Sequence, residues 1–514
     1  MKIRPIEKLI AAGFAGALLI SGFSAAGTVP AKSTGTQPAA PRLVLLPTRS
    51  PIVAFRLELR TGSIDDPAGQ EGLAALTAAA IGEGGSKSLA YTEILDKLYP
   101  MAASIDSHAD KEVTVFSGQV HRDHLEKFYS IFKEILTAPR FDQADFERVQ
   151  SDAENALTTG LRGSNDEGLG KWTLQLALFR NHPYGHVDTG TVAGIRAIKL
   201  EQVKSFYKSH YSRDRLVIGL AGGYPKRFPE RVQKDLMVLP EKSAPAVAIG
   251  SPSVRKGHHA TIVEKDARAT AVSWGFPIPV TRRDDDFFAL MIANSYLGEH
   301  RTFNGVLMNQ LRGVRGLNYG DYSYIENFIQ SGGSTFPIPN IPRTKQYFSV
   351  WIRPVKPDNA PFALRASLYH LDKMIREGIP EQGFKETRDF LLGYSRLWAQ
   401  STSRRLGYKL DSEWYGRKDF LDEIQKRLPS ITKAQVDTAI RKYLSMADIE
   451  IALVSSGGAK LKETLAGDAP TPIHYDTEGT PANILAEDKV IEAFPLGLKA
   501  DDIAIVPVAE MFEK

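Results

Sequence analysis

Hydrophobic and polar residues alternate along some stretches of the chain and recur at helical spacing along others. Residues 111–120 alternate between apolar and polar side chains, which predicts a strand with one buried face. Residues 123–136 place five apolar side chains on one side of a helix, namely Leu125, Phe128, Ile131, Phe132 and Ile135. Because runs of strands are followed by runs of helices, the pattern predicts an α+β fold in which helices pack against a sheet.

The same order of predicted elements occurs twice. A helix at 198–211 leads into an apolar strand at 216–221 and a glycine pair. A helix at 431–443 leads into a strand at 449–454 and a second glycine pair. The offset of about 232 residues, supported by a second and weaker pair of matching segments, favours duplication of a domain of about 220 residues.

Prolines and small residues interrupt the pattern between residues 240 and 258, so we expect the boundary between the two copies there. The predicted parts are a flexible leader at 27–41, an N-terminal domain at 42–245, a linker at 246–257 and a C-terminal domain at 258–514. The last stretch, 468–514, is punctuated by proline, and the pattern does not assign it to an element.

Composition narrows the class of protein. The chain has 514 residues and is 43% hydrophobic, which is enough for more than one buried core. Its 64 basic and 60 acidic residues nearly cancel, and this balance argues against nucleic acid as the main partner. The sequence contains no cysteine, which excludes disulfides, thiol catalysis and cysteine-bound zinc.

The first 26 residues have the features of a secretory signal. Lys2, Arg4 and Lys8 form a basic start, an apolar run follows, and the small residues 24–26 suggest cleavage after Ala26. The alternative is a short membrane anchor, although the run of about fifteen residues is shorter than the ~20 needed to span a bilayer. We therefore expect a periplasmic protein with no stable membrane span after processing.

Two segments carry a family resemblance. Leu311-Arg-Gly-Val-Arg-Gly-Leu-Asn-Tyr319 resembles a signature in the C-terminal half of the pitrilysin-like (M16) zinc peptidases. Gly72-Leu-Ala-Ala-Leu-Thr-Ala-Ala79 stands where the N-terminal half of that family carries its inverted zinc motif, H-x-x-E-H. His182-Pro-Tyr-Gly185 also matches a common family sequence, and we interpret it as a structural turn between helices.

The resemblance implies that this chain has lost its own metal site. Ala75 and Ala79 replace the two histidine ligands, and Ala78 replaces the catalytic glutamate. Glu154 falls where the family has its third ligand, so we interpret it as a relic, with an exposed helix glutamate as the alternative. A single carboxylate cannot hold zinc usefully. His121 and His124, and the pair Glu299-His300, are not expected to bind metal.

The resemblance also implies what the chain retains. In the family, an arginine and a tyrosine seven residues apart help to hold the peptide being cut, and Arg312 and Tyr319 match that pair. Tyr319 would donate its phenolic hydrogen to the scissile carbonyl, and Arg312 would orient the tyrosine or bind a substrate carbonyl. Arg315 lies between them, and we interpret it as a surface charge.

The resemblance therefore predicts two homologous M16-type domains that form half of a clamshell. We expect the chain to be inactive alone and to pair as a heterodimer with a zinc-bearing homologue. This chain would supply Arg312 and Tyr319 to the partner's site, where a peptide substrate adds to a sheet edge as a strand. The alternative is a non-catalytic assembly or peptide-binding protein with the same fold.

Overall fold

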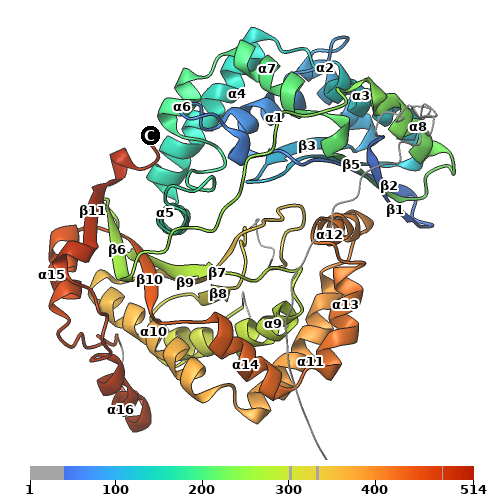
Figure 1. Ribbon diagram of the computed structural model, residues 1–514. Coiled ribbons are helices and arrows are strands. Elements are labelled where there is room, and N and C mark those ends of the chain that lie inside the picture. Colours follow the sequence, from blue (N-terminus) through green and yellow to red (C-terminus); the bar gives the residue numbers. More distant parts are fainter. Residues whose placement is uncertain (1–39, 300–303, 331–334, 477) are drawn as a thin grey trace, which may run out of the picture. The chain divides into compact units, whose positions relative to one another are not determined.

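The computed structural model of the protein describes residues 40–299, 304–330, 335–476 and 478–514. It confirms the α+β prediction, because the chain forms two mixed sheets, each covered by helices (Figure 1). We call residues 40–238 the first half and residues 257–514 the second half. The proposed signal peptide and His300 lie outside the described residues.

The first half contains a five-stranded sheet in which β1 runs parallel to β5 and the other neighbours are antiparallel. Its strands, in spatial order, are β1 (Arg42–Pro47), β5 (Leu216–Gly222), β2 (Ile52–Leu59), β4 (Thr114–His121) and β3 (Ser104–Ala109).

The second half contains a six-stranded sheet. Its strands, in spatial order, are β11 (Ile503–Pro507), β6 (Gly257–Glu264), β10 (Asp448–Ser455), β7 (Thr270–Ile278), β9 (Gln346–Val355) and β8 (Asp321–Tyr324). Without β11, the order and the parallel or antiparallel sense of each pair repeat those of the first sheet. The duplication predicted from the sequence is therefore present in the topology of the sheets.

Helices pack on one face of each sheet and bury a separate hydrophobic core. Those of the first half are α1 (Leu73–Gly82), α2 (Tyr91–Leu98), α3 (Leu125–Thr137), α4 (Gln143–Asn155), the π-helix η4 (Ala156–Ser164), α5 (Asp166–Leu178), α6 (Val192–Ala197), α7 (Leu200–His210) and α8 (Phe228–Asp235). The predicted apolar face at 123–136 is the buried face of α3, where Phe128 and Phe132 lie 5.3 and 5.4 Å from Phe55 of β2, measured between ring centroids.

The helices of the second half follow the same plan and extend beyond it. They are α9 (Asp286–Leu297), the π-helix η7 (Met308–Gly313), α10 (Ala360–Glu377), α11 (Glu381–Leu397), α12 (Thr402–Trp414), α13 (Phe420–Arg427), α14 (Lys433–Tyr443), α15 (Gly458–Gly467) and α16 (Ala482–Ile491). The stretch 468–514, which the sequence pattern did not assign, therefore contributes α16 and the edge strand β11.

Each half also covers the second face of the other half's sheet. Helix α5 of the first half packs against β7 and β10 of the second sheet. Helix α12 of the second half packs against β2 and β5 of the first sheet, where Leu406 and Leu410 contact Val217 and Ala221. Since α5 follows α4 and α12 follows α11, this exchange repeats the internal duplication.

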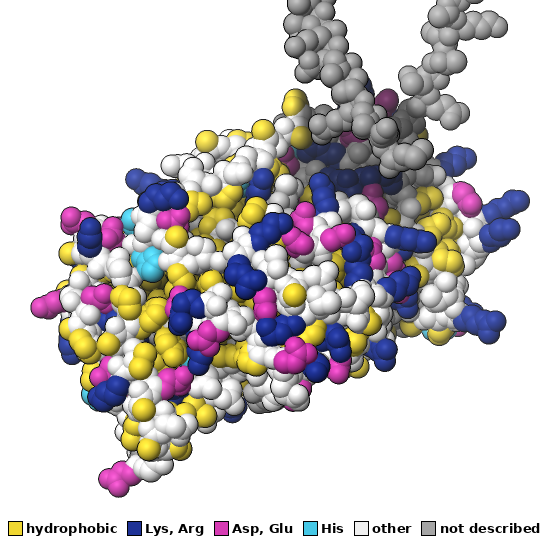
Figure 2. Space-filling model, turned by 60° about the horizontal axis from the view of Figure 1, so that its bottom comes forward, with side chains coloured by type: hydrophobic (Ala, Val, Ile, Leu, Met, Phe, Trp, Pro, Cys, Tyr) yellow, Lys and Arg dark blue, Asp and Glu magenta, His cyan; other side chains and the backbone are white. Residues whose placement is uncertain are grey.

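Residues 239–256, between the halves, form no helix or strand. Within the part of the chain that the structure describes, no helix is both long and apolar enough to cross a bilayer. On the face shown in Figure 2, basic and acidic side chains are interspersed rather than gathered by sign.

Candidate functional site

Helix α1 carries Ala75, Ala78 and Ala79, the three residues that the sequence analysis matched to the zinc motif of the family. Gly72 precedes it with a φ of 112°, and a side chain there would lie 2.6 Å from the carbonyl oxygen of Thr189. The buried carboxylate of Asp66 accepts hydrogen bonds from the backbone N–H groups of Gly72 and Ala74, at 2.8 and 2.7 Å. These contacts cap the helix without help from a side chain at Gly72.

Two of these alanines lie on the same side of the helix. Ala75 and Ala79 are both half-buried and lie one helical turn apart. Ala78 is buried, and its carbonyl accepts a hydrogen bond from Ser107 Oγ at 3.1 Å. Methyl groups have no lone pairs, and alanine is the best helix former, so α1 persists although its side chains do not fit a zinc ion.

Glu154, on α4, already has a partner. Its Oε1 accepts a hydrogen bond from Arg196 Nη2 at 2.6 Å, and this bond holds the pKa of Glu154 below its usual value. Its carboxylate is thus neutralised by a guanidinium instead of a metal ion. Among the described residues, no group of three or more histidine, aspartate and glutamate side chains is placed to hold a metal.

Arg312 lies at the C-terminal end of the π-helix η7, and Tyr319 lies in the segment between η7 and β8; we call residues 312–320 the Arg312–Tyr319 turn. The N–H of Gly316 donates to the Arg312 carbonyl at 2.9 Å, and the N–H of Leu317 donates to the Leu311 carbonyl at 3.1 Å. Gly316 closes this turn with a φ of 65°, a conformation that favours glycine. Tyr319 precedes β8 and is 80% exposed.

Asn318 fastens the turn directly beside Tyr319. Its Nδ2 donates to Asp321 Oδ1 at 2.7 Å and to the Arg353 carbonyl at 2.9 Å, and its Oδ1 accepts from the N–H of Gly320. Burial raises the pKa of Asp321 to about 8. The backbone on which Tyr319 stands is therefore tied to β8 and β9, while the phenol itself projects into solvent.

Arg315 is not a surface charge, and that interpretation was wrong. Its Nε donates to Asp488 Oδ1 at 2.7 Å, and its Nη2 donates to Glu487 Oε2 at 2.8 Å. The Arg315 side chain is fully buried, and both acidic partners belong to α16. Arg315 thus anchors the turn that carries Arg312 and Tyr319. Arg312, in contrast, is half-buried and makes no side-chain hydrogen bond or ion pair with a described residue.

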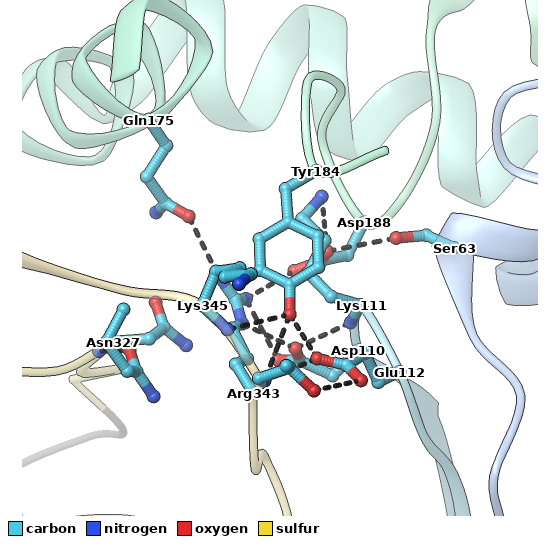
Figure 3. A network of polar contacts seen from close by, with 12 residues as sticks. Ser63, Asp110, Lys111, Glu112, Gln175, Tyr184, Asp188, Asn327, Arg343 and Lys345 are labelled. Carbon is cyan, nitrogen blue, oxygen red and sulfur yellow. Dashed lines mark hydrogen bonds and ion pairs between the residues drawn. The ribbon is translucent and has the colours of Figure 1, made fainter. Parts of the chain in front are cut away.

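A buried polar network joins the two halves (Figure 3). Arg343, from the segment before β9, donates from Nε to Asp110 Oδ1 at 2.7 Å and from Nη1 to Gln175 Oε1 at 3.0 Å. Asp188 contacts Lys111 at 2.7 Å and Arg343 at 3.3 Å. Burial alone would raise the pKa of Asp188, but these two cations hold it below its usual value.

The His182–Gly185 turn feeds the same network. His182 Nδ1 accepts from the N–H of Tyr184 at 3.1 Å, and the Tyr184 hydroxyl donates to Glu112. The backbone N–H of Thr344 also donates to Glu112, at 2.5 Å. His182 therefore shapes a turn between α5 and α6, as expected. His121 accepts a hydrogen bond from the N–H of Asp123 at the start of a helical turn.

Sequence reasoning missed this network and the anchor at Arg315. One signal was available, because the charged run Asp110-Lys-Glu112 directly precedes the mainly apolar residues 113–116, and the structure buries all three charged side chains. Buried charges require partners. The sequence could not name those partners, since Arg343 lies 233 positions from Asp110.

Two family descriptions match the chain. Residues 43–159 match "Insulinase (Peptidase family M16)", and residues 197–391 match "Peptidase M16 inactive domain". The curated protein "Non-peptidase homolog YmxG" of Helicobacter pylori is 25% identical over 419 residues, which cover 80% of this chain and 90% of that relative.

Solved structures share the fold. The peptidase M16 inactive domain from Pseudomonas fluorescens superimposes with a TM-score of 0.72 at 22% identity, covering 81% of this chain and 96% of that one. The periplasmic protease PqqL from Escherichia coli gives a TM-score of 0.65 at 15% identity, covering 89% of this chain and 50% of that one. With one family match in the first half and another that runs from the end of the first half to residue 391 of the second, the chain belongs to the M16 peptidase family.

Proposed function

We propose that this chain is the substrate-holding subunit of a heterodimeric M16 metallopeptidase. It supplies Arg312 and Tyr319 to the zinc site of a homologous partner and cleaves no peptide alone. The observation that carries the proposal is the contrast between an exposed phenol on a fastened turn and three alanines at the zinc positions. A packing role would not require Tyr319 to be 80% exposed.

The proposed chemistry needs a hydrogen-bond donor aimed at a peptide carbonyl. The Tyr319 hydroxyl could donate to the carbonyl oxygen on which negative charge develops during cleavage, and a zinc ion held by the partner would supply the activated water. The Arg312 guanidinium, which has no described partner, can bind a neighbouring substrate carbonyl with its planar fork of N–H donors. Fixing the backbone through Asn318 and Arg315 keeps this donor in place before the substrate arrives.

The test uses the complex with a zinc-bearing M16 homologue from the same organism. Tyr319→Phe keeps the ring and removes the donor, so the complex should assemble normally and cleave about 10²–10³-fold more slowly. Arg312→Ala should also lower activity, with weaker peptide binding. Tyr99→Phe is the matched control, because Tyr99 is 87% exposed and lies outside the Arg312–Tyr319 turn. If the complex forms and Tyr319→Phe cleaves at the unmodified rate, the proposed role of Tyr319 is wrong.

A second test addresses the chain alone. Purified protein should contain no tightly bound zinc and should show no chelator-sensitive cleavage. About one zinc per chain would contradict the proposal. We also propose periplasmic localisation, on the basis of the basic start and apolar run before Ala26. A mature N-terminus near residue 27 is the expected result, whereas a chain that retains Met1 would contradict it.

The alternative function is a non-catalytic assembly or peptide-binding protein. The Helicobacter pylori relative is named a non-peptidase homologue, and this similarity favours a role without peptidase activity. In that case no zinc-bearing homologue would gain activity when this chain is added, and Tyr319→Phe would change no rate.

A further inference from the structure

The last described residues of the second half bind to the first half. Beyond β11, the chain leaves the second sheet and ends beside α6 (Figure 1). We call residues 508–513 the tail segment. Met511 and Phe512 are 7% and 4% exposed, and both pack into the hydrophobic core of the first half.

The backbone of the tail segment is held as a bound peptide would be. The N–H groups of Val192 and Ala193 donate to the carbonyls of Phe512 and Glu513, at 2.8 and 3.0 Å. Arg162 Nε donates to the Met511 carbonyl at 2.6 Å. Three successive carbonyls thus accept hydrogen bonds from the first half.

The side chain of Glu513 adds a charged contact. Arg162 Nη2 lies 2.8 Å from Glu513 Oε2, and Arg196 Nη1 lies 4.0 Å from Glu513 Oε1. Arg196 is also the partner of Glu154, the relic of the zinc site. The Arg196 guanidinium, which pairs with Glu154, therefore also lies close to the tail segment. Phe512 has a φ of 59°, a conformation rarely adopted by a bulky residue, which indicates that the surrounding contacts impose it.

We propose that Arg162, Arg196 and the backbone of Val192–Ala193 form a binding site for a short peptide of two apolar residues followed by an acidic one. The tail segment is its resident ligand. This site does not depend on the proposed role of Arg312 and Tyr319. Main-chain hydrogen bonds provide sequence-independent affinity, while the apolar pair and the carboxylate provide specificity.

The experiment compares occupied and vacated sites in the full-length chain. A Met511→Ser/Phe512→Ser double variant removes the apolar contacts of the tail segment. A fluorescent peptide with the sequence of residues 506–514 should then bind saturably, as measured by anisotropy. The unmodified chain should bind it at least about tenfold more weakly, because its own tail segment competes. A folded double variant that binds no peptide would overturn the proposal.

Specificity is tested in the same background. Arg162→Gln should weaken peptide binding by about tenfold or more, since it removes charge-assisted hydrogen bonds. Arg122→Gln is the matched control, because Arg122 is exposed and its side chain pairs with no described residue. Equal binding by the Arg162→Gln and Arg122→Gln variants would refute the assigned site.

A measurement on the otherwise unmodified chain covers the case in which the double variant does not fold. The amides of residues 192–193 should exchange slowly with deuterium, and Arg162→Gln alone should accelerate their exchange. Fast exchange in the unmodified chain, or no change on Arg162→Gln, would show that the tail segment is not held as proposed.

Discussion

Helices α1 and α9 follow equivalent strands, β2 and β7, but present different surfaces. Helix α9 buries bulky side chains such as Phe287, Phe288 and Met291. Five of the ten residues of helix α1 are alanine, and Ala75 and Ala79 are half-buried. The accessible positions of α1 therefore carry methyl groups, which offer no ligand to a metal ion. In the second half, the accessible polar side chains are those of Arg312, at the end of η7, and Tyr319, on the segment after it. The duplicated fold fixes where helices pack, whereas the two halves differ in the side chains that they expose at equivalent places.

The largest loss of unfolding free energy is expected for a substitution in the polar network that joins the two halves. Arg343→Met would leave Asp110 and Gln175 in the interior without their cationic partner. Removing one partner of a buried ion pair costs about 3–5 kcal/mol of unfolding free energy. Urea denaturation should show this loss, and Arg180→Met is the control because Arg180 is exposed and pairs with no described residue. Equal midpoints for the two variants would mean that this network does not stabilise the joined halves.

The next largest loss of stability is expected for one of the two arginines of the Arg312–Tyr319 turn and not for the other. Arg315→Ala removes two ion pairs with α16 and strands the buried carboxylate of Asp488, so we expect a loss of about 3 kcal/mol. Arg312→Ala removes a side chain without a described partner and should change stability by less than about 0.5 kcal/mol. Thermal unfolding of the two variants is the measurement. Similar shifts for both would contradict the division into an anchor and a free binding group.

These two arginines also show what the sequence could and could not predict. The strands and the amphipathic helices follow from periodicity within short windows, so local pattern predicted them. The duplication followed from finding the same order of these elements twice. The absence of ligand side chains at Ala75, Ala78 and Ala79 was equally accessible, because it depends only on residue type. Arg315 was misjudged because its partner Asp488 lies 173 positions away, in a stretch whose pattern predicted no element.

The pairing of strands with one another was also not predictable from local sequence pattern. Strand β11 has no counterpart in the first sheet, and its pairing with β6 joins segments about 240 residues apart. The exchange of α5 and α12 between the sheets was likewise not predicted, since an amphipathic helix does not encode which sheet it covers. The Arg312–Tyr319 turn was found from its motif. The hydrogen bonds that Asn318 makes to Asp321 of β8 and Arg353 of β9 could be found only from the structure.

The smallest expected effect is on the pH dependence of stability, and it concerns two buried glutamates, one in each sheet. Glu450 on β10 is held by Arg255, with Nε 2.7 Å from Oε1. Glu58 on β2 is fully buried, and neither of its oxygens has a hydrogen-bond partner among the described residues. Burial, reinforced by the negative charge of Asp411, raises the pKa of Glu58 from 4.5 to about 8. The first sheet therefore contains a carboxyl group that is protonated near neutral pH.

The pH dependence follows from this difference. Between pH 4.5 and 8 the folded chain keeps a proton on Glu58 that the unfolded chain releases, so Glu58 lowers stability as pH rises. Glu58→Gln removes this titration. The variant should lose about 2 kcal/mol less unfolding free energy than the unmodified chain between pH 5 and pH 7. Glu450→Gln should instead lower stability at both pH values, because it leaves the partly buried Arg255 without its carboxylate. Urea unfolding of both variants at the two pH values is the measurement. Parallel pH profiles for Glu58→Gln and the unmodified chain would show that Glu58 is ionised in the folded protein and that the two sheets do not differ in this way.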